Sequence, residues 1–142
     1  MTLLVVALAA CATAPKAVMT PIGATASDAS TVSMLVATTR AQTGNPGEPY
    51  SGERGSMVDV NEVVVSIPPE RNRVTGEVQW PKKLPPDPER DFATVSSREI
   101  DGVPEARKWF AGYHDDDGRL LVFVHGFNNR YENSVYRFAQ IV

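Results

Sequence analysis

The first two thirds of the chain alternate between short β-prone runs and clusters of Gly and Pro. Four runs rich in β-branched or aromatic residues are predicted as strands: 32–39, 60–67, 75–80 and 92–96. Six Gly and Pro residues between positions 40 and 56 predict a long loop there, and the prolines of 82–90 predict an extended linker of the polyproline type. The pattern therefore predicts a β-rich N-terminal section.

The last third changes to helical spacing around one apolar run. Residues 104–113 predict a helix with Pro104 in its first turn. The run 119–124 is almost continuously apolar, which is typical of a strand buried on both faces of a parallel sheet. Residues 133–142 predict a second helix with one buried face. That face would be formed by Val135, Phe138, Ala139 and Val142. A helix, a buried strand and a helix in this order predict the α/β fold class, with a mostly parallel sheet and flanking helices.

The chain begins with ten mostly apolar residues that end in small side chains and precede its single cysteine, Cys11. The run Leu8-Ala9-Ala10-Cys11 resembles the lipobox of bacterial lipoproteins, which implies that residues 1–11 form a lipoprotein signal and that Cys11 carries lipid. Residues 12–30, rich in Ala, Thr and Ser, predict a flexible tether. No basic residue precedes the apolar run, which departs from the usual signal, and a buried element with a core cysteine is the alternative.

The lipobox resemblance also carries an expectation about location. Ala12, and not Asp, follows the cysteine. Resemblance to known lipoprotein sorting then implies the bacterial cell envelope, with a lipid anchor in the outer membrane and the protein facing the periplasm. No apolar run reaches the roughly 18 residues of a membrane-spanning helix. Lipid alone is therefore expected to make the contact with the membrane.

Composition removes several classes of function. The net charge is −3, from 14 basic and 17 acidic residues, and no basic stripe is visible, so nucleic acid is not expected as a partner. One cysteine excludes an internal disulfide, and two histidines with one cysteine exclude a zinc site of the finger type. The acidic run 114–118 favours a solvated turn over a calcium loop, because consecutive carboxylates do not converge on one ion. Neither a metal nor an organic cofactor is predicted.

One stretch carries recognisable chemistry, Phe123-Val124-His125-Gly126-Phe127-Asn128-Asn129, at the end of the apolar run. It resembles the loop after the third core strand of the α/β-hydrolase superfamily, which forms half of an oxyanion hole. The resemblance implies that the backbone N–H of Phe127 is the oxyanion donor, that Gly126 allows a sharp turn, and that His125 shapes the loop without acting as the base. The similarity extends back to about Val32 and points to a bacterial esterase- and lipase-like group.

The same resemblance implies a serine hydrolase that acts on a small-molecule carboxylic ester or related acyl bond. No serine of the chain lies in the G-x-S-x-G pattern of the superfamily's nucleophile, and the remaining triad residues should follow that pattern. We therefore interpret residues 31–142 as the N-terminal part of a hydrolase domain, truncated at its C-terminus, and expect the chain to be inactive by itself. The alternative is a non-catalytic envelope lipoprotein that uses a hydrolase-like scaffold for binding.

Overall fold

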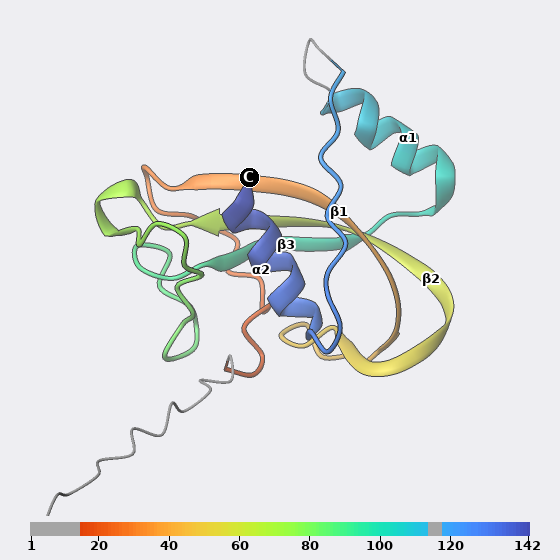
Figure 1. Cartoon of the computed structure of the whole chain (residues 1–142), viewed down its shortest axis with the longest axis horizontal. Helices are drawn as coiled ribbons and strands as arrows, with labels where there is room; N and C mark the ends of the chain where they lie inside the picture. Colours follow the sequence, from red (N-terminus) through yellow and green to blue (C-terminus); the bar gives the residue numbers. More distant parts are fainter. Residues whose placement is uncertain (1–14, 114–117) are drawn as a thin grey trace, which may run out of the picture.

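The computed structural model describes residues 15–113 and 118–142, which contain six elements (Figure 1). The strands are β1 (Ser30–Gln42), β2 (Tyr50–Ile67) and β3 (Ala93–Glu99). The helices are the short 3-10 helix η1 (Glu70–Asn72) and the α-helices α1 (Gly102–Gly112) and α2 (Tyr131–Ile141). The strands predicted at 32–39, 60–67 and 92–96 and both predicted helices correspond to these elements.

The three strands form one antiparallel sheet in the order β1-β2-β3. β1 pairs with β2 from Ser30, opposite Ile67, to Gln42, opposite Tyr50, and β3 pairs with the second half of β2. Neighbours in this sheet are consecutive in the chain, and antiparallel neighbours need no crossover connection. The β-prone runs of the first hundred residues are therefore sufficient to form the sheet.

The first two strands continue well into the region predicted as a loop over 40–56. Only residues 43–49 lie between β1 and β2, so two of the glycines that favoured a loop lie inside β2. A Cβ at Gly55 would lie 2.9 Å from the carbonyl oxygen of Arg40. Glycine at this position permits a close approach of the two strands, beside register shifts in the pairing where β2 bends (Figure 1).

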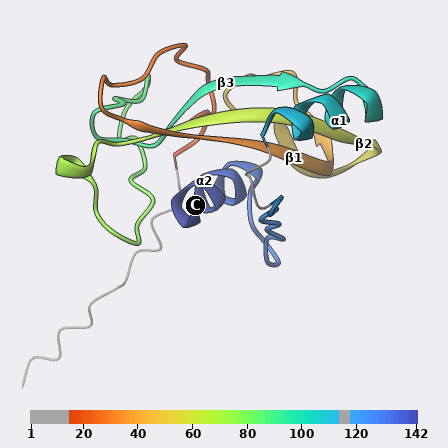
Figure 2. The same ribbon diagram turned by 90° about the horizontal axis from the view of Figure 1, so that it is seen from above.

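The core lies on the face of the sheet that α2 covers (Figure 2). β1 and β2 contribute alternate residues to it, because side chains alternate between the two faces of a strand. The buried residues of α2 are Tyr131, Glu132, Val135, Tyr136 and Ala139. The predicted buried face is confirmed at Val135 and Ala139, whereas Phe138 is half-buried and Val142 is exposed.

Helix α1 packs against the opposite face of the sheet. The indole Nε1 of Trp109 donates a hydrogen bond of 2.8 Å to Oε1 of Glu62 in β2. The Glu62 side chain lies on the face turned away from α2, because its neighbour Val63 points into the core. Arg98 of β3 forms ion pairs with Glu62 and with Glu105 of α1. The sheet thus has one helix on each face.

The residues ahead of β1 contribute to the same core. Val18 and Met19 are fully buried, and the N–H of Ile22 donates to the carbonyl oxygen of Thr94 in β3 (2.9 Å). The described part of the stretch expected as a tether, residues 15–30, therefore runs beside an edge strand and adds apolar side chains to the core.

The predicted signal and lipobox, including Cys11, lie outside the described residues. The division of the chain into segments 1–11, 12–30 and 31–142 stays a prediction. In the part of the chain that the structure describes, no helix is both long enough and apolar enough to span a membrane.

The prediction of an α/β fold with a mostly parallel sheet is wrong, because the sheet is antiparallel and the run 119–124 does not join it. Residues 120–124 of this run belong to no strand, and they cross the sheet on the side that carries α2 (Figures 1 and 2). Among the described residues the only strand beside β1 or β3 is β2, so no parallel neighbour exists for the run.

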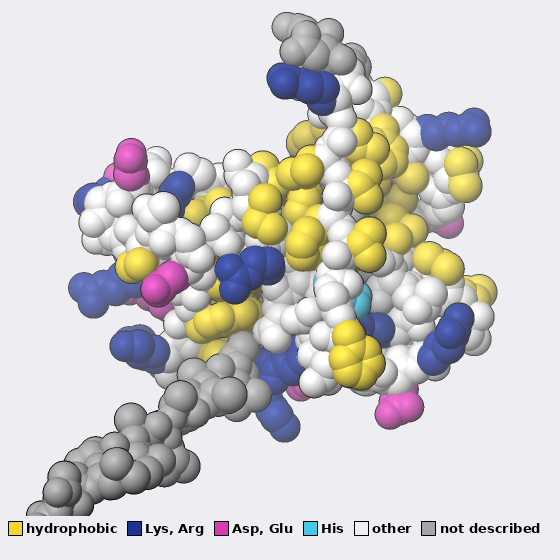
Figure 3. Space-filling view, viewed as in Figure 1, with side chains coloured by type: hydrophobic (Ala, Val, Ile, Leu, Met, Phe, Trp, Pro, Cys, Tyr) yellow, Lys and Arg dark blue, Asp and Glu magenta, His cyan; other side chains and the backbone are white. Residues whose placement is uncertain are grey.

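Its apolar side chains are therefore exposed instead of buried. The exposed fraction is 71% for Val122 and 85% for Val124. Figure 3 shows apolar side chains gathered on this part of the surface.

The chain between β2 and β3 also differs from the prediction. No strand forms over 75–80, and residues 82–90 turn back through bends instead of extending as a linker. The N–H of Phe92 donates to the carbonyl oxygen of Gln79 (2.9 Å). Trp80 packs against the core without belonging to a strand, so its burial does not depend on the ladder that the alternating pattern predicted.

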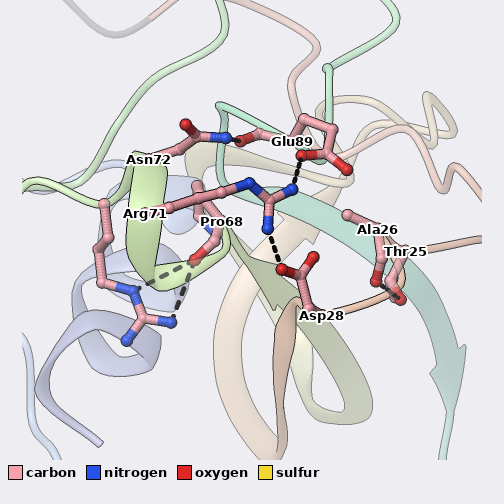
Figure 4. Close-up of polar contacts among 8 residues, drawn as sticks. Thr25, Ala26, Asp28, Pro68, Arg71, Asn72 and Glu89 are labelled. Carbon is pink, nitrogen blue, oxygen red and sulfur yellow. Dashed lines mark hydrogen bonds and ion pairs between the residues drawn. The ribbon is translucent and has the colours of Figure 1, made fainter.

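A polar cluster at the start of this linker holds three segments together (Figure 4). The Arg71 guanidinium forms ion pairs with Asp28, ahead of β1, and with Glu89, ahead of β3. The Asn72 amide donates to the carbonyl oxygen of Glu89 (2.8 Å). Because these side chains are about half exposed, the ion pairs contribute modestly to stability.

Candidate functional site

Residues 125–129, here called the HGFNN loop, lead from the exposed apolar run into α2. The guanidinium of Arg40 in β1 donates to the carbonyl oxygen of Asn129 (2.5 Å), and the Asn129 amide donates to the carbonyl oxygen of Gly126 (3.1 Å). Asn128 has φ +57°, in the left-handed region that asparagine adopts more readily than most residues. The loop is therefore a tight turn tied to the sheet by Arg40.

His125 is held in one tautomer by its own loop. Its Nδ1 lies 2.9 Å from the carbonyl oxygen of Gly126, and a carbonyl oxygen can only accept, so Nδ1 carries the proton. In the neutral ring the other nitrogen, Nε2, then has a free lone pair. Within residues 15–113 and 118–142, no carboxylate bonds to this histidine, so the base and acid of a triad are not assembled around it.

The predicted oxyanion donor lies on an open turn. The Phe127 side chain is fully exposed, and among the described residues no hydrogen bond involves its backbone N–H. A Cβ at Gly126 would meet only Nδ2 of Asn129, at 3.6 Å, which is ordinary contact. Crowding by the described neighbours therefore does not require glycine at this position. The oxyanion role of Phe127 stays a prediction.

A pocket of about 180 Å³ opens beside the HGFNN loop. The residues that line it are Val78, Trp80, Phe123, His125, Asn129, Asn133, Ser134 and Arg137. Its apolar lining residues come from the chain between β2 and β3 and from the run 119–124. Its polar lining residues come from the HGFNN loop and from α2. His125 also lines a wider cleft of about 450 Å³ over β1 and β2.

The pocket brings Ser134 of α2 to the same site as His125, which the sequence spacing does not indicate. The Ser134 hydroxyl donates to the carbonyl oxygen of Arg130 (3.2 Å), as helical serines often do one turn back. In the described part of the chain no hydrogen bond joins Ser134 to His125. The serine is therefore not activated as a nucleophile by this histidine.

Buried polar groups beneath the loop are structural. The rings of Tyr50 and Tyr131 pack with centroids 4.7 Å apart, and the Asn61 amide donates to the Tyr50 hydroxyl (2.6 Å). Burial raises the pKa of both tyrosines, so both stay protonated near neutral pH. Glu132 is 2% exposed and forms an ion pair with Arg130.

These groups do not form a metal centre. Among the described residues, no group of three or more His, Cys, Asp or Glu side chains could hold a metal ion. The absence of a cofactor stays a prediction.

Sequence reasoning missed several side chains that position or line the site, among them Arg40, Trp80 and Arg137. Arg40 contacts Asn129 across 89 positions, which no local pattern reveals. Arg137 lies four residues after Asn133 on α2, so both face the same side of the helix. That spacing was the one available signal for a polar helix face beside the loop.

Residues 104–142 match the family model described as α/β-hydrolase of unknown function (DUF900), which covers just over a quarter of the chain. The match includes the HGFNN loop, all of α2 and all of α1 except its first two residues, whereas the three strands lie outside it. It supports a relationship of this part of the chain to the α/β-hydrolase superfamily and suggests a hydrolase-like scaffold. No curated protein and no solved structure matches the chain.

Proposed function

We propose that this chain contributes an oxyanion-hole loop to a serine hydrolase that cleaves carboxylic esters or related acyl bonds. The observation that carries the proposal is the match of residues 104–142 to an α/β-hydrolase family, because the HGFNN loop lies inside it. In this assignment the Phe127 N–H stabilises the negative charge that develops on the substrate oxygen. An N–H on an open turn, with no partner among the described residues, is compatible with that role.

The proposal also states what other residues must supply. Acyl transfer by this mechanism needs a nucleophile, a base and an orienting acid within hydrogen-bond reach of one another. His125 and Ser134 line one pocket but are not hydrogen-bonded, and no serine has the G-x-S-x-G pattern. We therefore propose that the nucleophile and its partners lie outside these 142 residues, and that this chain alone does not turn over esters.

The test removes the backbone donor itself. In the protein expressed from its complete reading frame, Phe127→Pro eliminates the N–H, while Phe127→Ala keeps the N–H and removes the ring. With short-chain p-nitrophenyl esters, the Pro variant is expected to lose about 10²–10³ in kcat, and the Ala variant is expected to stay close to wild type. Circular dichroism verifies that both variants fold.

Two outcomes would overturn the proposal. Equal kcat values for the Pro and Ala variants would remove the oxyanion role of Phe127. No turnover by the wild-type protein would reject the hydrolase and favour the non-catalytic envelope lipoprotein.

We further propose that Cys11 carries a lipid anchor in the outer membrane of a bacterial envelope, with the protein facing the periplasm. The support is the lipobox resemblance of Leu8-Ala9-Ala10-Cys11, since these residues lie outside the described part of the chain. In detergent-phase partitioning of protein expressed with its native start, wild type and Thr13→Ser should enter the detergent, and Cys11→Ser should stay in water. Recovery of all three from the aqueous phase would contradict the anchor.

A further inference from the structure

We propose that the cleft over β1 and β2 binds a phosphate group, either free or at the end of a small organic phosphate. The cleft has a volume of about 450 Å³, and His125 of the HGFNN loop is one of the residues that line it. The inference concerns binding and not turnover, so it does not depend on the oxyanion role of Phe127.

Two arginines line the cleft from neighbouring strands. Arg40 of β1 is paired directly with Arg54 of β2. Side chains of directly opposed residues lie on the same face of a sheet with Cβ atoms about 5 Å apart, and like charges in that arrangement destabilise the pairing. The register shifts on both sides of Arg40, and such irregularities are common next to functional sites. The two guanidinium groups therefore favour an anion between them.

No described carboxylate neutralises either arginine. Arg40 donates to two backbone carbonyl oxygens, those of Ser51 (3.1 Å) and Asn129 (2.5 Å), which hold the guanidinium in place without cancelling its charge. These two bonds leave other N–H groups of the guanidinium for a ligand. The Arg54 side chain is exposed and bonds to no described residue. The cleft thus combines one cation that is held in place with one that has no partner.

The Thr38 hydroxyl, which also lines the cleft, adds a third donor. Its oxygen accepts from the N–H of Arg40 (3.2 Å), and no described residue accepts its proton. A carboxylate has two oxygen atoms, which a single guanidinium can engage in bidentate fashion. A phosphate group has at least three terminal oxygen atoms, so it can accept from two guanidinium groups and a hydroxyl together. The set of donors therefore favours phosphate over a carboxylate.

Isothermal titration calorimetry on the full chain measures binding at neutral pH, in a phosphate-free buffer of constant ionic strength. The probes are inorganic phosphate, glycerol 3-phosphate and acetate. We expect the phosphates to bind with a Kd on the order of 1 mM and acetate to bind about ten-fold more weakly. The tighter of the two phosphates identifies the source of the group. Equal binding of acetate and phosphate, or no binding of either phosphate, would overturn the inference.

Variants test the arginine pair. Arg54→Gln should weaken phosphate binding about ten-fold, and its fold should be unchanged because the side chain has no described partner. Arg107→Gln, which removes an exposed arginine of α1, should bind as wild type does. Glu53 is the one described acidic residue that lines the cleft, so Glu53→Gln should tighten binding several-fold. Equal affinities of the two arginine variants would reject the site.

Melting temperatures give a second measure of the same pair. In phosphate-free buffer Arg54→Gln should melt above wild type, because the variant lacks the opposed like charges. Added phosphate should raise the Tm of wild type more than that of the variant. A variant that melts below wild type without phosphate would contradict the repulsion between Arg40 and Arg54.

The binding and ester measurements fail independently. Phosphate binding without ester turnover by the complete protein would reject the proposed hydrolase and leave this inference standing. Turnover without phosphate binding would do the reverse.

Discussion

Tyr136 joins segments from opposite ends of the described chain. Its hydroxyl donates to the carbonyl oxygen of Val18 (2.9 Å) and lies 3.2 Å from Oγ1 of Thr94. Its ring packs against Trp80 and Phe92. One side chain of α2 therefore contacts the N-terminal segment, β3 and the linker.

Replacing Tyr136 by Phe should lower the free energy of unfolding by about 1–2 kcal/mol, because a buried carbonyl and a buried hydroxyl lose their partner. Urea unfolding followed by circular dichroism measures the change. Tyr113→Phe is the control, since Tyr113 is 57% exposed and its hydroxyl bonds to no described residue. Equal stability of the two variants would show that the buried hydrogen bonds contribute nothing.

The same burial predicts a loss of stability in alkali. Burial raises the pKa of Tyr136 to about 12, from an ordinary value of 10.0. Tyrosine is neutral below its pKa, so this contribution is fully present below pH 10 and is lost as the pH rises towards 12. The free energy of unfolding should fall by about 3 kcal/mol over that range, with a further loss in the same direction from Tyr131.

Unfolding in urea at several pH values from about 9 to 12 measures this loss. Tyr136→Phe should show a smaller decrease than wild type. Identical decreases in the two proteins would exclude Tyr136 as the source.

Single-residue burial could be predicted from the sequence only where spacing alone determines it. Val135 and Ala139 were identified because apolar residues at helical spacing face one side. Tyr131, Tyr136 and Glu132 were not, because a polar side chain gives no local signal of burial, and the Tyr131 hydroxyl is buried even without a hydrogen-bond partner among the described residues. The partner of Tyr136 lies 118 positions away in the sequence, so no local pattern shows it.

At the scale of the elements, two glycines of β2 differ in the space that a side chain would have. Gly55 lies close to β1, whereas Gly52 does not. Gly55→Ala places a Cβ 2.9 Å from the Arg40 carbonyl oxygen, so we expect a loss of about 1–3 kcal/mol in the free energy of unfolding. Gly52→Ala is the matched control in the same strand, because a Cβ there meets nothing within 4 Å. Its stability should be unchanged or slightly higher. Thermal unfolding measures the stability of both variants. A Gly55→Ala variant as stable as Gly52→Ala would contradict the close approach of Gly55 to Arg40.

The elements with the clearest periodicity were predicted and those with ambiguous signals were not. The many glycines of residues 40–56 favoured a loop. Glycine also occurs where two strands approach closely, and the sequence alone does not distinguish these two causes. The apolar composition of residues 119–124 predicts a buried strand. Whether the run is buried depends on a neighbouring strand, which would have to be formed by other segments of the chain. The HGFNN loop was identified because its residues are contiguous, whereas Arg40 and Arg137 reach it only through the fold.

For the whole molecule, residues 120–124 form a segment outside the sheet whose apolar side chains are exposed to water. Such a segment favours pairing with another chain. Val122→Lys should therefore raise the soluble fraction and lower light scattering several-fold at equal concentration. Val58→Lys, at a position 63% exposed on β2, is the control and should change scattering little. Equal effects of the two substitutions would show that surface charge, and not this run, governs association.

The contact between the N-terminal segment and α2 has a consequence for the order of events during synthesis. The Val18 carbonyl accepts from Tyr136, 118 positions later, and the Pro15 carbonyl accepts from Arg130, 115 positions later. A ribosome adds roughly 5–20 residues per second, so these acceptors wait on the order of 6–24 s for their donors. Once the three strands have been made, the core face of their sheet lacks its covering helix until α2 follows, and residues 15–18 are not yet held by that helix. The core of this protein is therefore completed only after α2, the last helix of the described chain, has been synthesised.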